Sequence, residues 1–545
     1  MLKFFHGYHP DVWDALIKTG MLTEYDGVRI PQDITIKEYK QFNNVAKRGG
    51  HLHKFMQEHK LPFYIDRLQG GTFIDHYPYD TKLLHEYIDL VGDENYYGMQ
   101  MHEWVSNYWS DLGKIGDLPD REWKAENIAK RVNEKYKMPY LFLETMDEYE
   151  MEEFGCPKNS YEIYNVVKKL YARRVSEHYR ILPVDSIGLA FALEIEYGAK
   201  RFMAEIGAQT PHTRLQVAYG RGMAKAHGCE FGTYYETWGG SPFTTCNYQK
   251  DGKNEWDTEK PEDFPYQAAG SNGGSSRSLQ ERLYVYSLMN NVDFMSEEWS
   301  VANIFYDWDE FELSPYGKIN VWFADFRRKY SDVGAKLTPI AAVLNSSHKI
   351  LDRLASINGF GEVAVGGEAE QKMVKIKYDL KQIFANATEM KGNARWKALD
   401  NSNVPDAIDL LNFTENGALG KYKYLIDVTA TSQLRDSAWS DKICEIDDIE
   451  SILRKELPCY VDGGLLWQVN ERIGGGYYLT VFNNSGVNRT VADGESIEPD
   501  SDITVTLTFK GDAAPVLCDG NGTLSKNDGV YRLNVKGGSW CILKF

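Results

Sequence analysis

The stretch Tyr234–Gly240 (YYETWGG) has the pattern of a β-strand that ends and opens into a loop. The run before it, which starts at Cys229, is rich in aromatic residues and follows a segment with helical periodicity, and two glycines close it. A carboxylate, Glu236, stands at this end between Tyr235 and Trp238. Taken alone, Glu236 has a simple explanation as a residue that leaves a strand into solvent.

The same pattern of a strand paired with a helix recurs along the first part of the chain. The predicted strands are 2–8, 62–68, 96–102, 139–145, 181–187, 201–206, 229–235 and 292–298. Helical spacing lies between them, as in the apolar series Ile163, Val166, Val167 and Leu170. Eight such pairs within roughly 330 residues predict a (β/α)8 barrel, in which functional side chains gather at the C-terminal ends of the parallel strands.

Two smaller domains are expected after the barrel. Short apolar strands at 339–344, 407–411 and 424–428, separated by helical segments, predict a flavodoxin-like α/β domain. From about Gly464 the chain alternates in the manner of strands separated by turns, which predicts a small antiparallel β domain. The predicted domains are therefore a barrel (1–335), a flavodoxin-like α/β domain (336–462) and a C-terminal β-sandwich (463–545).

Composition narrows the class of protein. The 545 residues carry a net charge of -18, which argues against binding to nucleic acid or to an anionic membrane. The sequence has no long uncharged apolar stretch and no apolar segment at its start. The seven cysteines are scattered and odd in number, which favours reduced thiols. We therefore expect a cytoplasmic protein, unless a signal peptide has been removed.

Acidic residues end five of the predicted strands. They are Glu103, Glu144, Glu205, Glu236 and the pair Glu297 and Glu298. At one barrel mouth these carboxylates would repel one another, which would raise the pKa of some of them. Glycoside hydrolysis needs such a set, because one carboxylic acid protonates the departing oxygen while a second carboxylate attacks or activates water. Each glutamate alone is better explained as a partner for Arg67 or for a loop amide; the set as a whole is not.

The residues beside these acids suit a sugar ring. Aromatic faces stack on sugar C–H bonds, and Tyr235, Trp238 and Trp299 could do so here. Sugar hydroxyls would be bound by Glu103, Glu205 and Glu298. His6 and His102 also end predicted strands and would either contact hydroxyls or be buried structural histidines. Because the cysteines lack metal-site spacing and His51, His53 and His85 fall on predicted surface helices, we expect no metal and no cofactor.

The order of these domains resembles the three-domain layout of family 42 β-galactosidases and related clan A glycosidases. The resemblance implies that the acid/base glutamate ends strand 4, the nucleophile ends strand 7, an arginine ends strand 2 and an aromatic residue follows strand 8. In the predicted strand count, these places hold Glu144, Glu236, Arg67 and Trp299. Leu143 stands where the clan has an asparagine, and the family's zinc-binding cysteine cluster is missing. The resemblance also implies a homo-oligomer, commonly a trimer.

The predicted function is hydrolysis of a glycosidic bond with retention of configuration. Glu236 would be the nucleophile and Glu144 the acid/base, while Arg67 would keep Glu236 ionised. Two alternatives remain open. A miscount of strands would pair Glu205 with Glu236, and a barrel of this kind could also bind carbohydrate without cleaving it.

Overall fold

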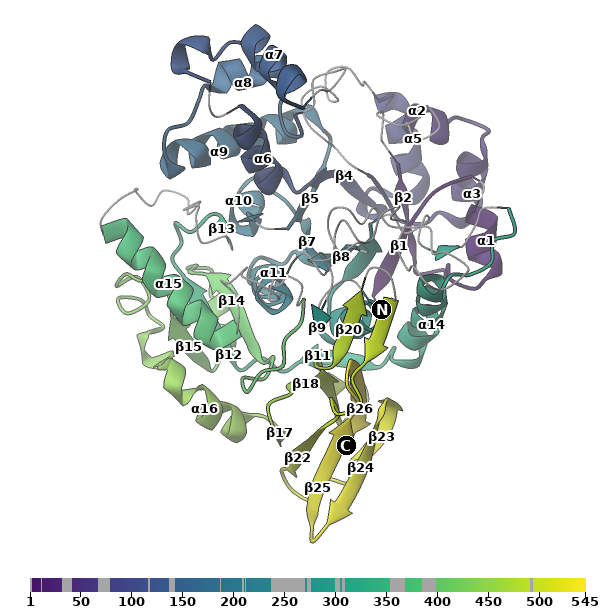
Figure 1. Ribbon diagram of the computed structural model, residues 1–545, viewed down its shortest axis with the longest axis vertical. Coiled ribbons are helices and arrows are strands. Elements are labelled where there is room, and N and C mark those ends of the chain that lie inside the picture. Colours follow the sequence, from purple (N-terminus) through teal and green to yellow (C-terminus); the bar gives the residue numbers. More distant parts are fainter. Residues whose placement is uncertain are drawn as a thin grey trace.

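The structure is a computed structural model in which an eight-stranded barrel is followed by a parallel and two antiparallel sheets (Figure 1). It describes residues 2–10, 12–31, 42–66, 79–115, 118–136, 143–186, 188–207, 210, 212–236, 270–271, 276–298, 304–305, 309–352, 368–384, 398–490 and 494–545. Within these residues no helix is long and apolar enough to cross a membrane.

The N-terminal part forms a closed barrel of parallel strands, which confirms the predicted (β/α)8 fold. Its strands are β1 (Lys3–Gly7), β2 (Gly27–Ile30), β3 (Phe63–Ile65), β4 (Tyr96–His102), β5 (Ile181–Asp185), β7 (Arg201–Gly207), β8 (Glu230–Glu236) and β10 (Phe294–Glu297). Each pairs in parallel with its neighbours, and β10 closes the ring against β1. All C-terminal strand ends therefore lie at the same mouth.

The strand count differs from the prediction at two places. The second strand is β2, whereas the predicted second strand contains β3. The predicted strand 139–145 is not one of the eight: the barrel closes without it, and its residues 139–142 lie outside the described residues. A four-residue strand that contains Arg29 has little apolar pattern to reveal it, whereas PYLFLET has the apolar run of a buried strand.

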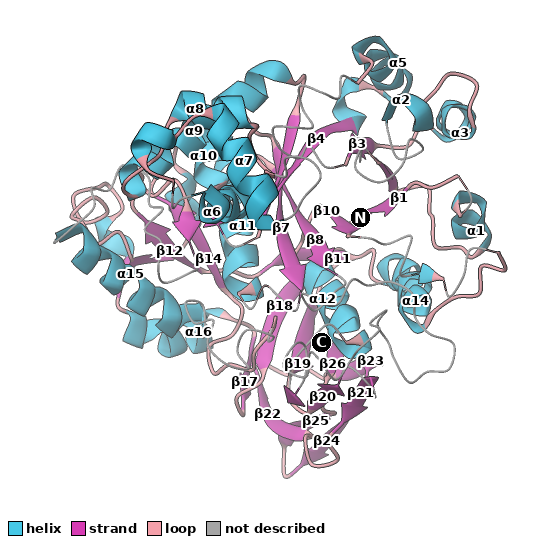
Figure 2. Ribbon diagram, turned by 45° about the horizontal axis from the view of Figure 1, so that its top comes forward, coloured by secondary structure: helices cyan, strands magenta, loops and turns pink. Residues whose placement is uncertain are grey.

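Helices surround the barrel and fill the connections between its strands. They are α1 (Trp13–Lys18), α2 (Phe42–Val45), α3 (His51–His59), α5 (Thr81–Val91), α6 (Trp104–Ile115), α7 (Ala125–Tyr136), α8 (Glu148–Phe154), α9 (Ser160–Glu177), α10 (Phe191–Glu196), α11 (Thr213–His227), α12 (Arg277–Met289) and α14 (Pro315–Lys329). Capping residues set where two of these helices begin. The Ser276 side chain accepts from the Leu279 N–H at the start of α12, and Ser314 caps α14 directly before Pro315. The four helices α6–α9 all lie between β4 and β5 and form one group beside the barrel (Figures 1 and 2).

Aromatic residues and glycines alternate inside the barrel. The interior is filled by Phe5, Tyr64, Tyr97, Leu182, Val184, Met203, Tyr234 and Phe294. A Cβ on Gly27 would lie 2.3 Å from the Phe5 ring, and a Cβ on Gly232 would lie 2.4 Å from the Phe294 ring. The glycines leave space that the rings occupy, so the lower barrel is a packed core.

The remaining chain forms the predicted α/β and β domains. A parallel sheet in the order β14 (Ile408–Asn412), β12 (Ile340–Leu344), β15 (Tyr424–Asp427) and β16 (Ile443–Cys444) lies beside α15 (Glu368–Phe384) and α16 (Ile449–Glu456) (Figure 1). One antiparallel sheet runs β11 (Val333–Lys336), β18 (Leu466–Arg472), β19 (Tyr477–Asn483), β26 (Ser539–Lys544), β23 (Val516–Gly520), and the other runs β17 (Cys459–Asp462), β22 (Ile503–Phe509), β25 (Val530–Val535), β24 (Gly522–Asn527).

Short strands tie these parts together. β9 (Gly270–Ser271) pairs with β20 (Val487–Thr490), which pairs with β21 (Gly494–Ile497), and β6 (Gly188–Leu189) pairs with β13 (Leu351–Asp352). β11 and β17 precede the predicted start of the last domain at residue 463 but belong to its sheets. The exact domain boundaries stay a prediction.

Candidate active site

Alternation along β8 decides which of its side chains reach the barrel mouth. Tyr234 belongs to the interior cluster, and Glu236, two residues further on, faces the same side. Tyr235 faces outward, where its ring packs edge-on against Tyr284 of α12 at 5.6 Å. The prediction that Tyr235 lines a sugar site is therefore wrong in its placement, because neighbouring strand residues point to opposite faces.

Four glutamates gather where the barrel strands end. Glu205 is the last inward-facing residue of β7 before Gly207, Glu236 is the last residue of β8, and Glu103 and Glu298 directly follow β4 and β10. The electrostatic influence of the other three on Glu205 places them around it. Glu205, Glu236 and Glu298 are buried, with 4%, 1% and 3% of their surface exposed, whereas Glu103 is half-buried.

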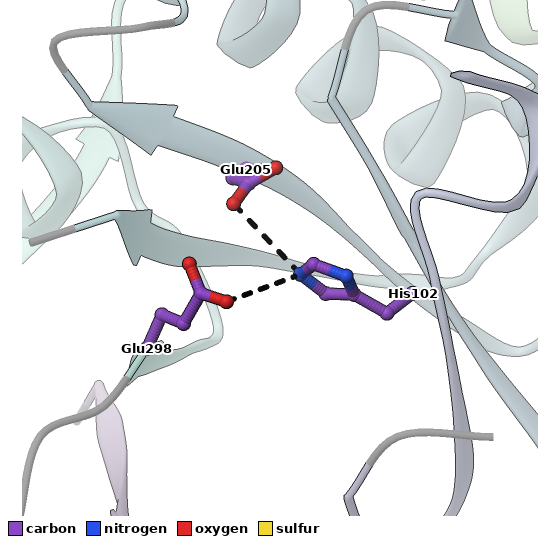
Figure 3. Close-up of side chains that lie close together, drawn as sticks. All are labelled: His102, Glu205 and Glu298. Atoms are coloured by element: carbon purple, nitrogen blue, oxygen red, sulfur yellow. Dashed lines mark ion pairs between the residues drawn. The ribbon is translucent and has the colours of Figure 1, made fainter. Parts of the chain in front are cut away.

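His102 lies at the centre of this acidic group. Its Nε2 is 3.8 Å from a Glu205 oxygen and 4.0 Å from a Glu298 oxygen, and its Nδ1 is 3.8 Å from a Glu103 oxygen. Figure 3 shows the carboxylates of Glu205 and Glu298, which come from separate strands, turned toward Nε2 of His102. One ligand atom each from His102, Glu205 and Glu298 lies within 4.8 Å of the other two, so these three residues could hold a metal ion.

Burial and neighbouring negative charge both raise the pKa of Glu205. Burial is the largest cause that raises its pKa well above the ordinary value, and Glu103, Glu298 and Glu236 add to it. A hydrogen bond with Glu103 raises it further. A hydrogen bond between two carboxyl groups needs one proton, which Glu205 and Glu103 therefore share.

Arg29 on β2 brings a positive charge into the barrel. Its Nη1 donates to the Tyr234 hydroxyl at 2.8 Å, and its Nε lies 3.7 Å from the Asp66 carboxylate. Burial is the largest single influence and opposes the charged guanidinium, but Asp66, Tyr234, Tyr64 and Glu298 together outweigh it, so the pKa of Arg29 lies above its ordinary value. Sequence reasoning missed Arg29 because its strand was not recognised; a basic residue in an otherwise apolar four-residue run was the available signal.

The backbone at Glu103 is unusual. Its N–H donates to the Val184 carbonyl at 2.7 Å, so it continues the pairing of β4 with β5. Its φ of 47° then lies in the left-handed region, which few residues other than glycine adopt, and α6 begins at the next residue. This turn holds Glu103 at the rim of the barrel, and strained residues of this kind are frequent at functional sites.

Glu144 does not stand at the end of a barrel strand. It lies in the long connection between β4 and β5, where its side chain accepts from Lys114 at 3.1 Å and its N–H donates to Asp111. The assignment of Glu144 to the end of strand 4 is therefore wrong, because that strand is β4 and ends at His102. The catalytic role of Glu144 loses the reason that suggested it.

The remaining predicted site residues fall into two groups. His6 points away from the barrel interior toward Asp26, 3.4 Å away, and Asp26 is also bound by Arg327 of α14. The expectation that His6 contacts substrate is thus wrong in placement, since residues next to the interior Phe5 face the helices. Arg67, Trp238 and Trp299 lie outside the described residues.

Comparison with known proteins finds a similar architecture at low sequence identity. No family model matches the chain, and no curated protein matches it. A β-galactosidase from the Antarctic haloarchaeon Halorubrum lacusprofundi is similar with a TM-score of 0.44 and 8% identity over 100% of this chain and 99% of that one. An exo-β-1,4-mannosidase from Opitutaceae bacterium strain TAV5 is similar with a TM-score of 0.35 and 8% identity over 90% of each chain.

Proposed function

We propose that this chain is a glycoside hydrolase that cleaves a glycosidic bond with retention of configuration. The observation that carries the proposal is the position of Glu236 and Glu103, at the ends of the seventh and fourth strands of one barrel, in a single group of carboxylates. Two carboxyl groups, one as nucleophile and one as acid/base, are the minimum that this reaction requires.

In the proposed reaction, an oxygen of Glu236 attacks the anomeric carbon while Glu103 gives the departing glycosidic oxygen the proton that it shares with Glu205 across their hydrogen bond. The bond from Glu236 to the sugar forms as the bond to the leaving group breaks. Glu103, now a carboxylate, then takes a proton from water, whose oxygen displaces Glu236 from the sugar. Arg29 holds Tyr234 beneath Glu236 through its 2.8 Å hydrogen bond.

The corrected strand count supports Glu103 as the acid/base. In the clan A pattern, strand 4 supplies this residue and strand 2 supplies an arginine, and with β2 included these places fall on Glu103 and Arg29. The chain departs from the pattern at His102, which stands where the clan has an asparagine. The rim position and partial exposure of Glu103 suit a residue that must reach both a leaving group and water.

Glu205 is the second candidate for the acid, because a raised pKa favours the protonated form that a general acid needs. The depth of Glu205 in the barrel argues against this role. On β7 and β8, Gly207 pairs with Glu236 whereas Glu205 pairs with Tyr234, so Glu205 lies one inward-facing position deeper. A sugar oxygen in the mouth would meet Glu236 and Glu103 first, and Glu205 then serves to hold a proton beside Glu103.

The substrate class is proposed as an oligosaccharide or simple glycoside. The layout that resembles family 42 makes a β-galactoside the first candidate. A panel of nitrophenyl glycosides tests the function, and proton NMR of the first product of the best substrate tests the stereochemistry. The proposal expects the product to keep the anomeric configuration of the substrate. An inverted first product would contradict retention, and sugar binding without hydrolysis on any member of the panel would favour a silent carbohydrate-binding barrel.

A further inference from the structure

We propose that His102, Glu205 and Glu298 bind one divalent transition-metal cation, Zn²⁺ or Mn²⁺, at the floor of the barrel mouth. This site does not rest on the proposed glycosidase activity, because it follows from the three side chains themselves. It departs from the expectation drawn from the sequence that the chain holds no metal.

The separations within this trio suit a shared ion better than direct contact. His102 Nε2 lies 3.8 Å and 4.0 Å from the two carboxylate oxygens, which is too far for a hydrogen bond. Ligand atoms bound about 2.0–2.2 Å from one ion lie roughly 3–4 Å from each other. The three donor atoms here all lie within 4.8 Å of one another, so small side-chain movements would close them around a cation.

The scaffold holds these donors in place. They come from the ends of three different barrel strands: β4 carries His102, β7 carries Glu205, and Glu298 directly follows β10. The Glu298 N–H donates to the Tyr235 carbonyl at 2.8 Å, so this residue still belongs to the barrel ladder. Sites carried by strands keep their geometry better than sites carried by loops. Figure 3 shows the two carboxylates approaching the imidazole from separate strands.

The charge around the trio favours a cation. Glu103 and Glu236 bring two more carboxyl groups close to Glu205, and all three trio members are at most 5% exposed. Arg29 supplies one positive charge, which acts on Glu298 as well as on Asp66, so it offsets only part of this negative charge. Buried carboxylates in excess of positive charge must take up protons or bind a cation. A divalent ion would neutralise Glu205 and Glu298 together.

The donor set indicates which cations to expect. One imidazole nitrogen with two carboxylate oxygens is a mixed set, which suits Zn²⁺ and Mn²⁺, whereas Mg²⁺ and Ca²⁺ prefer oxygen ligands alone. Three protein ligands leave coordination positions open for water or for hydroxyl groups of a ligand.

The test uses the full chain after dialysis against EDTA. Isothermal titration calorimetry with Zn²⁺, Mn²⁺, Mg²⁺ and Ca²⁺ should show about one Zn²⁺ or Mn²⁺ bound per chain and much weaker binding of the other two. Each of the variants His102→Gln and Glu298→Gln should weaken binding by more than the roughly 10–100-fold that loss of an outer-shell partner costs. The matched control is His85→Gln, an exposed histidine on α5, which should bind as the parent does.

A second readout needs no variant. Pulsed electron paramagnetic resonance of the Mn²⁺-loaded parent should show coupling to an imidazole nitrogen. The proposal is overturned if the EDTA-treated parent binds neither ion, if binding survives both substitutions, or if the bound Mn²⁺ shows no nitrogen coupling. Ion binding by a protein that cleaves no glycoside would keep this site and remove the proposed function. Glycosidase activity without ion binding would keep the proposed function and remove this metal site.

Discussion

The carboxyl group of Glu236 occupies the space that a side chain at Gly207 would need. A Cβ built on Gly207 would lie 2.7 Å from the Glu236 Cβ, 2.7 Å from the Glu236 carbonyl oxygen and 3.1 Å from its Oε2. All three distances are shorter than van der Waals contact, and the two residues pair directly across β7 and β8. The absence of a side chain on β7 therefore sets the position of the proposed nucleophile.

Substitution of Gly207 by Ala should displace Glu236 while the barrel stays folded. A shift of about 1 Å in a reacting group can lower the rate roughly 10²-fold, so we expect kcat to fall by about that factor. Gly113→Ala is the matched control, because a Cβ there meets nothing within 4 Å in the exposed part of α6. Steady-state kinetics with a nitrophenyl glycoside would measure both, and unchanged kcat in Gly207→Ala would contradict the role given to Glu236.

Replacing Glu236 by Gln should abolish turnover. The amide keeps the size of the side chain but removes the nucleophile and the charge that stabilises the oxocarbenium-like transition state. We expect a loss in kcat on the order of 10³-fold or more, which exceeds what one binding contact explains. Glu230→Gln, at the opposite end of β8, should remain close to the parent. Equal losses in the two variants would mean that stability and not chemistry was affected.

A buried acid pair outside the barrel interior should make stability depend on pH. Burial, and then Asp185, raise the pKa of Glu194 well above its ordinary value of 4.5, and the two carboxyl groups share a hydrogen bond. The folded chain therefore keeps a proton that the unfolded chain releases above about pH 4.5, so this group's contribution to stability falls as pH rises. A change from pH 5 to pH 8 should therefore lower the unfolding free energy of the parent more than that of Glu194→Gln.

Urea unfolding of the parent and of Glu194→Gln at both pH values measures this effect. Glu196→Gln, two residues further along α10 and exposed, serves as the control and should follow the parent. A parent-to-variant difference in unfolding free energy that is the same at pH 5 and pH 8 would show that Glu194 is ionised in the folded chain.

Association through the middle domain is a further prediction. Val374 and Tyr378 lie one turn apart on α15 and are 69% and 64% exposed, and large apolar side chains grouped on a surface often mark an interface. Light scattering should give a particle mass that is a multiple of the 62.3 kDa chain mass. The double variant Val374→Lys/Tyr378→Lys should have a lower particle mass. Ile473→Lys, which is 67% exposed in the C-terminal domain, is the control. A parent particle of single-chain mass would remove this prediction.

Much of the fold could be predicted from the sequence because strands such as β4, β7 and β8 are seven residues long and rich in apolar and aromatic residues. β2 could not, since four residues with a central arginine carry too little pattern to distinguish a strand from a turn. This one omission, together with the apolar run before Glu144, shifted the strand count. It moved the expected acid/base from the end of β4, which Glu103 follows, to Glu144, and the expected arginine from Arg29 on β2 to Arg67.

Part of the site was beyond sequence reasoning for a different reason. Barrel strands are buried on both faces, so polarity does not reveal which residues point inward. The alternation that separates Glu236 from Tyr235 is plain in the sequence, but only the packing of Tyr235 on α12 shows which of them faces the mouth. The trio of His102, Glu205 and Glu298 comes from strands almost 200 residues apart, and no local motif marks it.

Azide rescue of alanine variants tests the central claim most directly. With a nitrophenyl glycoside, Glu103→Ala should retain formation of the glycosyl-enzyme, because nitrophenolate departs with little help from an acid, but should hydrolyse it slowly. Azide needs no general base, so it should restore turnover in Glu103→Ala and give a glycosyl azide of retained configuration. The same treatment should not accelerate Glu144→Ala or Glu205→Ala. Rescue at Glu205→Ala or Glu144→Ala in place of Glu103→Ala would contradict the assignment of Glu103 as the acid/base.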